Sequence, residues 1–360
     1  MDKPNTDGDI FHYISHDNNM NVVRYVLALL VLLAHYAFLT GLDVSVGWLS
    51  YIGVGGFFSL SGFLLFASFQ RRQKMKHYIS RRAKKILPPY CFIVLLCAMS
   101  LWAVSDLSVG EYFSSSGFWA YLGANLSFMN FLHPGLPGVF DGEAFLTPAV
   151  NGSLWTMKGE WICYLSVPFV FFMMKRWRRH AGTLLLGVIA LLMAMKICLY
   201  EVSEIPEYSR VQLYGKQFEI FMYFYIGALV NLCYPLFLKY KWWVLGVNII
   251  IAIFSDYIPL YGEIIQPFVI GTSVLWFSLV GKWGASLSRH DNVSYDMYLY
   301  HFPIIQLWVY LGMTDRISPV TGFMIILGAT VVLAEFSWNF IGKQFYRGER
   351  KKIEVHRIGR

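Results

Sequence analysis

Arg24 and His35 are two ionisable side chains in an apolar stretch, residues 21–40, that is long enough for a membrane helix. They are eleven positions apart, which at about 100° per residue places them within about 20° of each other on one helix face, roughly 16 Å apart along the axis. Imidazole is suited to general-base catalysis and guanidinium to binding anions. The pair therefore predicts an anion site and a reaction site at two depths. The alternative is that Arg24 reaches lipid phosphates and His35 is a hydrogen-bonded packing residue.

Glu160 provides a carboxylate at a similar predicted depth. If the apolar stretch 152–174 starts at the outer surface, helical rise places Glu160 about 12 Å and His35 about 8 Å below that surface. Glu160 is therefore a candidate to orient His35 or to stabilise its imidazolium, as the carboxylate of a serine triad does. The alternative is neutralisation by Lys158, although residues two apart on a helix do not face each other.

Two further stretches place polar groups inside apolar segments. Tyr298 and His301 are three apart, hence on one helix face, and Pro303 is expected to kink that helix. Ser61 lies in a run of small residues, 53–63, that permits close helix or ligand approach. For both stretches, structural packing is an alternative to a functional role.

The composition requires a membrane to position these groups. The chain is 56% hydrophobic and 14% charged, with a mean hydropathy of +0.48, whereas soluble domains carry about 25% charged residues. We therefore predict an all-α membrane protein with one transmembrane domain at 21–341, preceded by a segment at 1–20 and followed by a basic tail at 342–360. Its ten predicted spans are 21–40, 51–69, 88–105, 152–174, 182–200, 217–235, 242–257, 263–280, 294–312 and 319–341.

Loop charge predicts the orientation. With both termini cytoplasmic, 24 of the 30 Lys and Arg residues fall in inner segments, and the outer side holds Arg210, Arg316 and Lys216, as the positive-inside rule requires. Anionic lipid headgroups then account for the net charge of +8 without a nucleic-acid partner. Residues 1–20 lack the basic start and short apolar core of a signal peptide, so the first helix is expected to stay in the protein.

The five cysteines and one long outer segment are the remaining features that could carry a function. All five cysteines lie in apolar segments without a CxxC or Cys/His ligand spacing, so we predict neither a disulfide nor a metal site. The outer segment 106–150 contains no Lys or Arg and is long enough to form a lid or an acceptor platform. Within it, residues 117–132 are expected to be interfacial or re-entrant, or else part of an aromatic belt.

Five motifs resemble, in order, those of the acyltransferase-3 family of integral-membrane acyltransferases, over Asn21 to about Phe340. They are Arg24 with His35, the run 57–63 (FFSLSGF), the basic stretch 82–88 (RAKKILP), Leu154-Trp155 with Glu160, Tyr164 and Pro168, and Ser294, Tyr298, His301 and Pro303. Lys85 stands where many members have a second Arg, and Gly55 where an acidic residue is common.

The resemblance implies ten core helices, a cytoplasmic acyl-CoA donor and an acceptor that is often a cell-surface glycan or its lipid-linked precursor. It also implies that His35 is catalytic and that Arg24 and the basic stretch hold CoA. Lys85 supplies positive charge without the bidentate fork of an Arg. Membrane lipids are the other expected partners, a homo-oligomer is left open, and the expected location is the bacterial inner membrane.

Acyl transfer from a thioester to a sugar hydroxyl needs a base, oxyanion stabilisation and exclusion of water. We predict His35 as the base and Glu160 as its helper. Acetyl-CoA is the expected co-substrate, with no cofactor bound permanently; its predicted binding residues are Arg24, Arg81, Arg82, Lys85 and Ser61, with Lys84 also able to reach its phosphates. Trp155, Tyr298 and His301 are predicted to support the site. Direct transfer is favoured over an acyl-enzyme on Ser61 or His35.

The main rival from another class is a secondary transporter or flippase, in which buried charges line a substrate pathway. Such a transporter is expected to show paired halves, and no internal repeat relates residues 21–180 to 181–341. An acyltransferase is therefore the favoured function.

Overall fold

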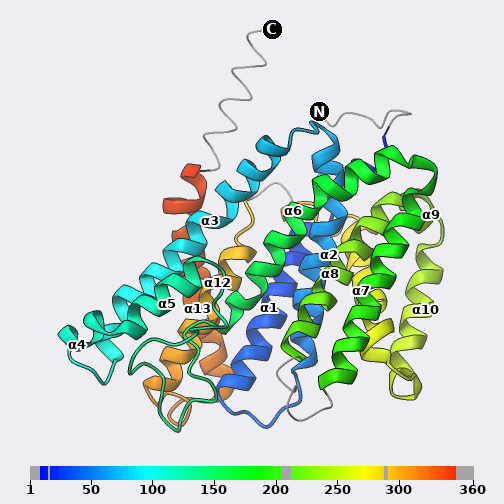
Figure 1. Cartoon of the computed structure of the whole chain (residues 1–360). Helices are drawn as coiled ribbons and strands as arrows, with labels where there is room; N and C mark the ends of the chain where they lie inside the picture. The colour runs from blue at the N-terminus through cyan, green and yellow to red at the C-terminus, as the bar shows by residue number, and fades with distance from the viewer. Residues whose placement is uncertain (1–8, 15–16, 204–211, 288–290, 346–360) are drawn as a thin grey trace. The chain divides into compact units, whose positions relative to one another are not determined.

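A computed structural model describes residues 9–14, 17–203, 212–287 and 291–345, and these form helices joined by turns and loops, with no strand among them. Figure 1 shows the helices. In chain order they are α1 (Met20–Leu39), α2 (Trp48–Gln70), α3 (Met75–Ser100), η1 (Leu101–Val104), α4 (Val109–Ser114), α5 (Ser116–Leu126), η2 (Gly152–Leu154), α6 (Trp155–Arg176), η3 (Arg178–His180), α7 (Ala181–Ser203), α8 (Gln212–Leu232), α9 (Tyr234–Lys239), α10 (Lys241–Ile253), η5 (Ser255–Tyr257), η6 (Tyr261–Ile265), α11 (Gln266–Leu279), α12 (Ser294–Tyr310), α13 (Pro319–Ser337) and η8 (Trp338–Gly342).

Each of the ten segments predicted to span the membrane coincides with a helix. Six helical stretches are long and apolar enough to cross a membrane: 20–39, 48–70, 75–104, 178–199, 261–279 and 319–345. The helix α10 is apolar but has only 13 residues, and α12 has 17. The chain is therefore a multi-pass helical membrane protein, while a total of ten spans and the orientation of the termini remain predictions.

The third predicted span differs most from the structure. Its helix, α3, begins at Met75 rather than at residue 88, so the basic stretch lies on helical turns instead of in a loop. No Pro or Gly interrupts residues 75–87, and Pro88 and Pro89 are accommodated inside the helix. The basic side chains are consequently arranged with helical spacing.

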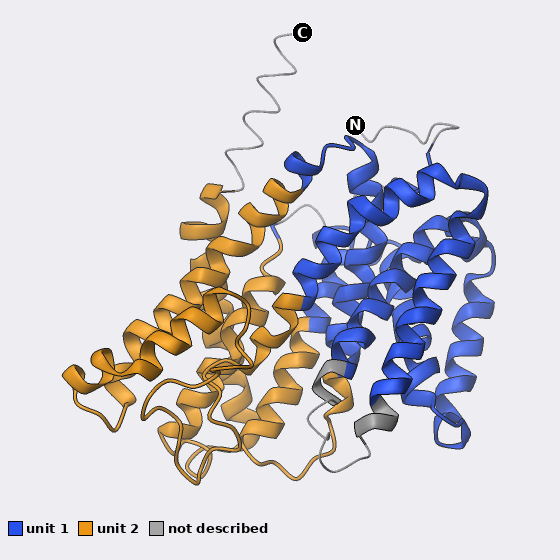
Figure 2. Ribbon diagram, in the orientation of Figure 1, with its two compact units in different colours: residues 1–27, 51–78, 159–291 blue, residues 28–50, 79–158, 292–360 orange. Residues whose placement is uncertain are grey.

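The chain divides into two compact units (Figure 2). Unit 1 comprises residues 1–27, 51–78 and 159–291, and unit 2 comprises 28–50, 79–158 and 292–360. The predicted segment 1–20 contributes to unit 1. The predicted basic tail begins at the end of η8, and its residues 346–360 lie outside the described part of the chain.

In unit 1, glycines allow α2 and α8 to pack backbone against backbone. A Cβ at Gly62 would lie 1.7 Å from the Phe224 carbonyl oxygen, and one at Gly227 would lie 2.0 Å from that of Ser59. No side chain fits at either position. Gly62, in the run 53–63, and Gly227 therefore serve the close packing of these two helices.

The N-terminal segment 9–14 is held on unit 1 by two buried side-chain amides. Gln70 accepts hydrogen bonds from the backbone N–H groups of Ile10 and Phe11, at 2.7 and 3.0 Å, and donates to the Phe11 carbonyl at 2.9 Å. Asn231 likewise accepts from the His12 N–H at 2.8 Å and donates to its carbonyl at 3.1 Å. The Phe11 side chain is only 1% exposed, so this segment is an integral part of the unit.

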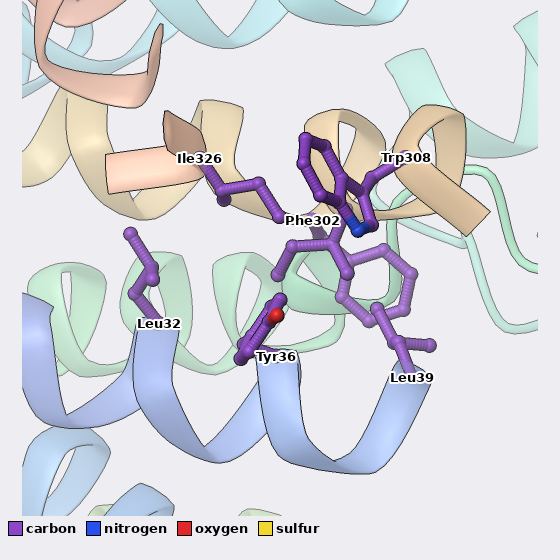
Figure 3. Close-up of a cluster of buried hydrophobic side chains, with 7 residues drawn as sticks. Leu32, Tyr36, Leu39, Phe302, Trp308 and Ile326 are labelled. Carbon is purple, nitrogen blue, oxygen red and sulfur yellow. The ribbon is translucent and has the colours of Figure 1, made fainter. Parts of the chain in front are cut away.

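In unit 2, the C-terminal part of α1 packs against α12 and α13 (Figure 3). Leu32 and Tyr36 of α1 meet Phe302 and Trp308 of α12 and Ile326 of α13 in one buried cluster. Burial of a large apolar side chain contributes roughly 1.5–3 kcal/mol in water. In lipid this driving force between helices is absent, so close side-chain packing holds the helices together. This contact fixes α1 beside α12, which carry His35 and His301.

Candidate active site

The His35 and His301 side chains, 266 residues apart in sequence, form a hydrogen-bonded pair in unit 2. His35 Nδ1 lies 2.8 Å from His301 Nε2, and the ring centroids are 5.0 Å apart with an interplanar angle of 17°, so the two rings meet edge to edge in nearly one plane. The Phe302 ring meets His35 edge-on at 5.3 Å. His301 is 1% exposed, whereas His35 is half-buried. The pair thus has a buried member and a member that can be reached.

The second nitrogen of His301 fixes which atoms carry protons. His301 Nδ1 is 3.2 Å from the Met297 carbonyl oxygen, and because a carbonyl only accepts, Nδ1 must carry the hydrogen of a neutral ring. Nε2 then has the lone pair and accepts a hydrogen bond from His35 Nδ1–H. This assignment, made from the network, leaves the lone pair of His35 on Nε2. His35 Nε2 is therefore an available general base.

Pro303 frees the backbone group through which residues 151–153 attach to α12. Proline has no N–H, so the Leu299 carbonyl four residues earlier loses its helical partner. The Asn151 side chain donates to that carbonyl at 2.8 Å, and its oxygen accepts from the Ser153 N–H at 3.2 Å. Asn151 is 4% exposed. The turn of α12 that precedes Pro303 and the start of η2 are thus joined beside His301.

The short helix η2 and the first turn of α6 each bring a hydroxyl group to α12. Ser153 Oγ is 3.3 Å from His301 Nε2, and Thr156 Oγ1 is 3.0 Å from the Tyr298 hydroxyl. Tyr298 also lies 3.0 Å from the Ser153 carbonyl oxygen, to which it donates. This approach needs Gly152, because a Cβ there would lie 2.6 Å from the Phe302 ring. The polar groups of η2, the first turn of α6 and α12 therefore form one buried network around His301.

The other predicted catalytic group, Glu160, belongs to unit 1. Its carboxylate accepts a hydrogen bond from the Tyr164 hydroxyl, one helical turn away on α6. Lys158 is the residue that the alternative interpretation paired with Glu160. Its Nζ lies over the Phe131 ring, 4.5 Å from the ring centroid. The role of Glu160 in catalysis stays a prediction.

The predicted acyl-CoA residues occupy three helices. Arg24, half-buried, donates to Asn21 at 3.4 Å on the first turn of α1. Ser61 is half-buried on α2. Their roles stay predictions, as does the supporting role of Trp155, which begins α6.

The basic residues of the third motif lie on the first turns of α3. Arg81 and Arg82 are half-buried, and Lys85 is exposed. Lys85 interacts electrostatically with Asp296, a 2% exposed residue of α12. Asp296 in turn accepts a hydrogen bond from Ser337 at 2.8 Å. Lys85 therefore has a structural partner in unit 2 as well as a predicted role with CoA.

Three members of the network were not identified from the sequence: Asn151, Ser153 and Thr156. They stand at the start of the fourth predicted span, where polar residues are expected, so their type gives little signal. A signal was available in Pro303, because a proline inside a membrane helix requires a donor from elsewhere for the freed carbonyl. In the described residues, no group of three or more His, Cys, Asp or Glu side chains is placed to hold a metal ion.

Comparisons with known proteins agree with this architecture over most of the chain. A family model described as an acyltransferase domain matches residues 17–335. An O-acetyl transferase of Shigella phage Sf6 is 23% identical over 369 residues, covering 94% of this chain and 98% of that protein. Nodulation protein 10 of Rhizobium leguminosarum bv. viciae is 23% identical over 368 residues, covering 92% of this chain and 93% of that protein. No solved structure matches the chain.

Proposed function

Because the chain belongs to the acyltransferase-3 family of membrane acyltransferases, we propose that it transfers acetyl from cytoplasmic acetyl-CoA to a hydroxyl of a cell-surface carbohydrate or lipid-linked glycan. His35 Nε2 is the proposed general base. The bacterial inner membrane is the proposed location. The likeness to an O-acetyl transferase over nearly the full length of both chains supports the acetyl group and the oxygen acceptor.

The hydrogen-bonded series from His35 through His301 to the Met297 carbonyl carries the proposal. A general base must present its lone pair in a fixed direction, and the third group of a catalytic triad provides this orientation. Here His301 provides it as a neutral acceptor. The edge contact with Phe302 further fixes the His35 ring.

The reaction balances without any further reactant. His35 Nε2 takes the proton of the acceptor hydroxyl while the oxygen attacks the thioester carbonyl, forming a C–O bond. The C–S bond then breaks, and the sulfur leaves as a thiolate that takes the proton back from His35. The products are an acetyl ester and free CoA. The His35 imidazolium keeps its Nδ1–H on His301 throughout, so the ring does not need to turn.

On the donor side, the proposal assigns the CoA phosphates to Arg24, Arg81, Arg82 and Lys85. Arg81, Arg82 and Lys85 share the first turns of α3, and a positively charged helix face is suited to phosphate groups. Glu160 is retained as a candidate to stabilise developing positive charge. Both assignments are testable separately from the base.

The decisive experiment measures transfer from labelled acetyl-CoA to lipid-linked glycan and surface polysaccharide extracted from the host cells, using the purified protein in detergent. Removal of a general base typically costs about 10²–10⁴ in rate, so we expect His35→Ala to fall in this range. His301→Gln preserves a neutral acceptor for His35 Nδ1–H and should retain more activity than His301→Leu. Arg24→Ala should raise the KM for acetyl-CoA.

The control is His180→Ala, an exposed histidine of η3, which should transfer acetyl at the wild-type rate. Equal rates for wild type and His35→Ala would exclude His35 as the base. Absence of CoA-dependent transfer with every acceptor would instead favour transport or flipping. Mass analysis of surface polysaccharide from cells with and without the protein then identifies the modified sugar.

A further inference from the structure

A second polar cluster lies inside unit 1, and none of its residues is assigned to the acyl-transfer chemistry. Lys196 Nζ of α7 is 3.2 Å from Glu219 Oε2 of α8, and the two side chains are 11% and 9% exposed. Ionisable side chains within membrane helices are costly and usually face a cavity or a functional pathway. The pair also lies within apolar stretches, so its presence calls for an explanation.

The surroundings of the pair are unusual for a purely structural ion pair. Lys196 Nζ also donates to the Gly262 carbonyl at 2.8 Å, and Gly262 belongs to η6, a π-helical turn. Leu260, just before this turn, has a left-handed φ of 53°. Single π-helical turns occur frequently at functional sites, and a left-handed backbone at a non-glycine residue carries local strain. Lys196 is thus hydrogen-bonded to a backbone carbonyl in an irregular turn.

Hydrogen-bonding capacity remains at this cluster. An ammonium has three donors, and Lys196 uses two in the contacts above. Glu219 is bound through Oε2. The Tyr223 hydroxyl, one turn from Glu219 on α8, is buried and interacts with that carboxylate. One ammonium donor, the remaining lone pairs of the carboxylate and the lone pairs of the Tyr223 hydroxyl therefore converge at one place.

The cluster has an aromatic side that can be reached from solvent or lipid. Tyr51 of α2 interacts electrostatically with Glu219 and is 40% exposed. The Tyr223 ring occupies space that exists only because residue 55 is glycine, since a Cβ there would lie 2.5 Å from the ring.

Depth and charge indicate what binds there. Lys196 is seven residues before the end of α7 and Glu219 seven after the start of α8, so each is about 10 Å from the helix ends that loop charge predicts to be outside. The pair has no net charge, so it does not attract the polyanionic CoA. A sugar ring has hydroxyls that both donate and accept, together with apolar C–H faces that pack on aromatic rings. A sugar ring therefore matches both the hydrogen-bonding groups and the aromatic rings of the cluster.

We propose that Lys196, Glu219 and Tyr223 form a binding subsite for a neutral sugar ring of the acceptor, with Tyr51 at its exposed side. The proposal rests on the function proposed above, because it assigns the acceptor's place in unit 1. One sugar hydroxyl donates to Glu219 and accepts from Lys196, and another pairs with the Tyr223 hydroxyl. The subsite selects and holds the acceptor but takes no part in proton transfer.

The test uses a double variant that removes both charges together, Lys196→Met/Glu219→Leu. Replacing a buried ion pair by apolar residues of similar size is often neutral or stabilising, whereas removing one partner leaves an uncompensated charge. The protein should therefore remain folded, as judged by its size-exclusion profile in detergent and its binding of labelled acetyl-CoA. Asn248→Leu is the matched control, since Asn248 is also a buried polar residue of unit 1 and is bonded to Thr272 and Ser273.

Binding is measured by saturation-transfer difference NMR with neutral methyl glycosides of glucose, rhamnose and N-acetylglucosamine. We expect at least one glycoside to gain signal with wild type and with Asn248→Leu, and to lose at least about fivefold with the double variant. Equal signals for wild type and the double variant overturn the subsite, as does absence of signal from every glycoside. Acetyl transfer is assayed in parallel, so transfer without glycoside binding refutes only the subsite, and glycoside binding without transfer refutes only the enzymatic function.

Discussion

The link between Asn151 and the carbonyl freed by Pro303 predicts a specific rescue. Asn151→Ala removes the donor to the buried Leu299 carbonyl, and an unsatisfied buried polar group costs about 1–3 kcal/mol. It also removes the cap on the Ser153 N–H, worth about 1 kcal/mol. Pro303→Ala restores an N–H four residues after Leu299. In that background the first cost disappears, so Asn151→Ala should destabilise the protein by only about 1 kcal/mol.

The measurement is the free energy of unfolding of the two single variants, the double variant and wild type, by SDS titration in mixed micelles. Loss of the hydrogen bond from the Ser153 N–H costs the same with and without Pro303→Ala, so it cancels in the double-mutant cycle. A coupling free energy of about 1–3 kcal/mol remains. Gln306→Ala is the control, because Gln306 bonds to the carbonyls of Thr147 and Ala149 instead and should cost the same with or without Pro303→Ala. Equal costs for Asn151→Ala in both backgrounds would refute the proposed compensation.

Three further outcomes are expected. Gly152→Ala should lower both stability and transfer, because its Cβ would lie 2.6 Å from the Phe302 ring; adding Phe302→Leu should recover part of the loss in thermal-stability and activity assays. Gln70→Leu should release the N-terminal segment, seen as faster protease cleavage within 9–14 while the helices stay protected. Burial lowers the pKa of His12 below its ordinary value of 6.5, with Asp9 opposing in part. The unfolded segment therefore binds the proton more tightly, so docking is complete above pH 6.5 and weakens as the pH falls below it, which hydrogen exchange of this segment measures.

The helices were predictable because a membrane span needs a long apolar stretch, and apolar stretches are visible in the sequence. The start of α3 was not, since the basic residues before Pro88 resemble a loop in composition while containing nothing that stops a helix. The division into two units was also not predictable. It depends on which helix faces pack together, and nearly uniform apolar helices carry little periodicity to indicate a face.

The site was predictable in its residue types and less so in its pairings. His35 and His301 could each be selected as polar groups inside apolar segments. Only the fold brings their ring nitrogens, 266 positions apart in the sequence, to a distance of 2.8 Å. The same holds for Lys196 and Glu219, which are visible in the sequence as charges within apolar segments and gain meaning only as neighbours on α7 and α8. The sequence shows which polar side chains must be buried within apolar segments, at a cost in free energy. The hydrogen-bond or ion-pair partner that offsets this cost lies far away in the sequence.

A neutral partner suits a base that works inside a membrane. A carboxylate hydrogen-bonded to His35 would bring a permanent charge into a medium of low dielectric, where an isolated ion is strongly disfavoured. His301 holds the ring through a neutral hydrogen bond, with its own proton on the Met297 carbonyl. With both histidines neutral, this pair carries no charge at rest, and a positive charge on the proposed base His35 arises only while a negative charge develops on the carbonyl oxygen of the thioester. The two charges form and disappear together, so His35 needs no carboxylate hydrogen-bonded to it at rest, and the proposed role of Glu160 is limited to the transient imidazolium.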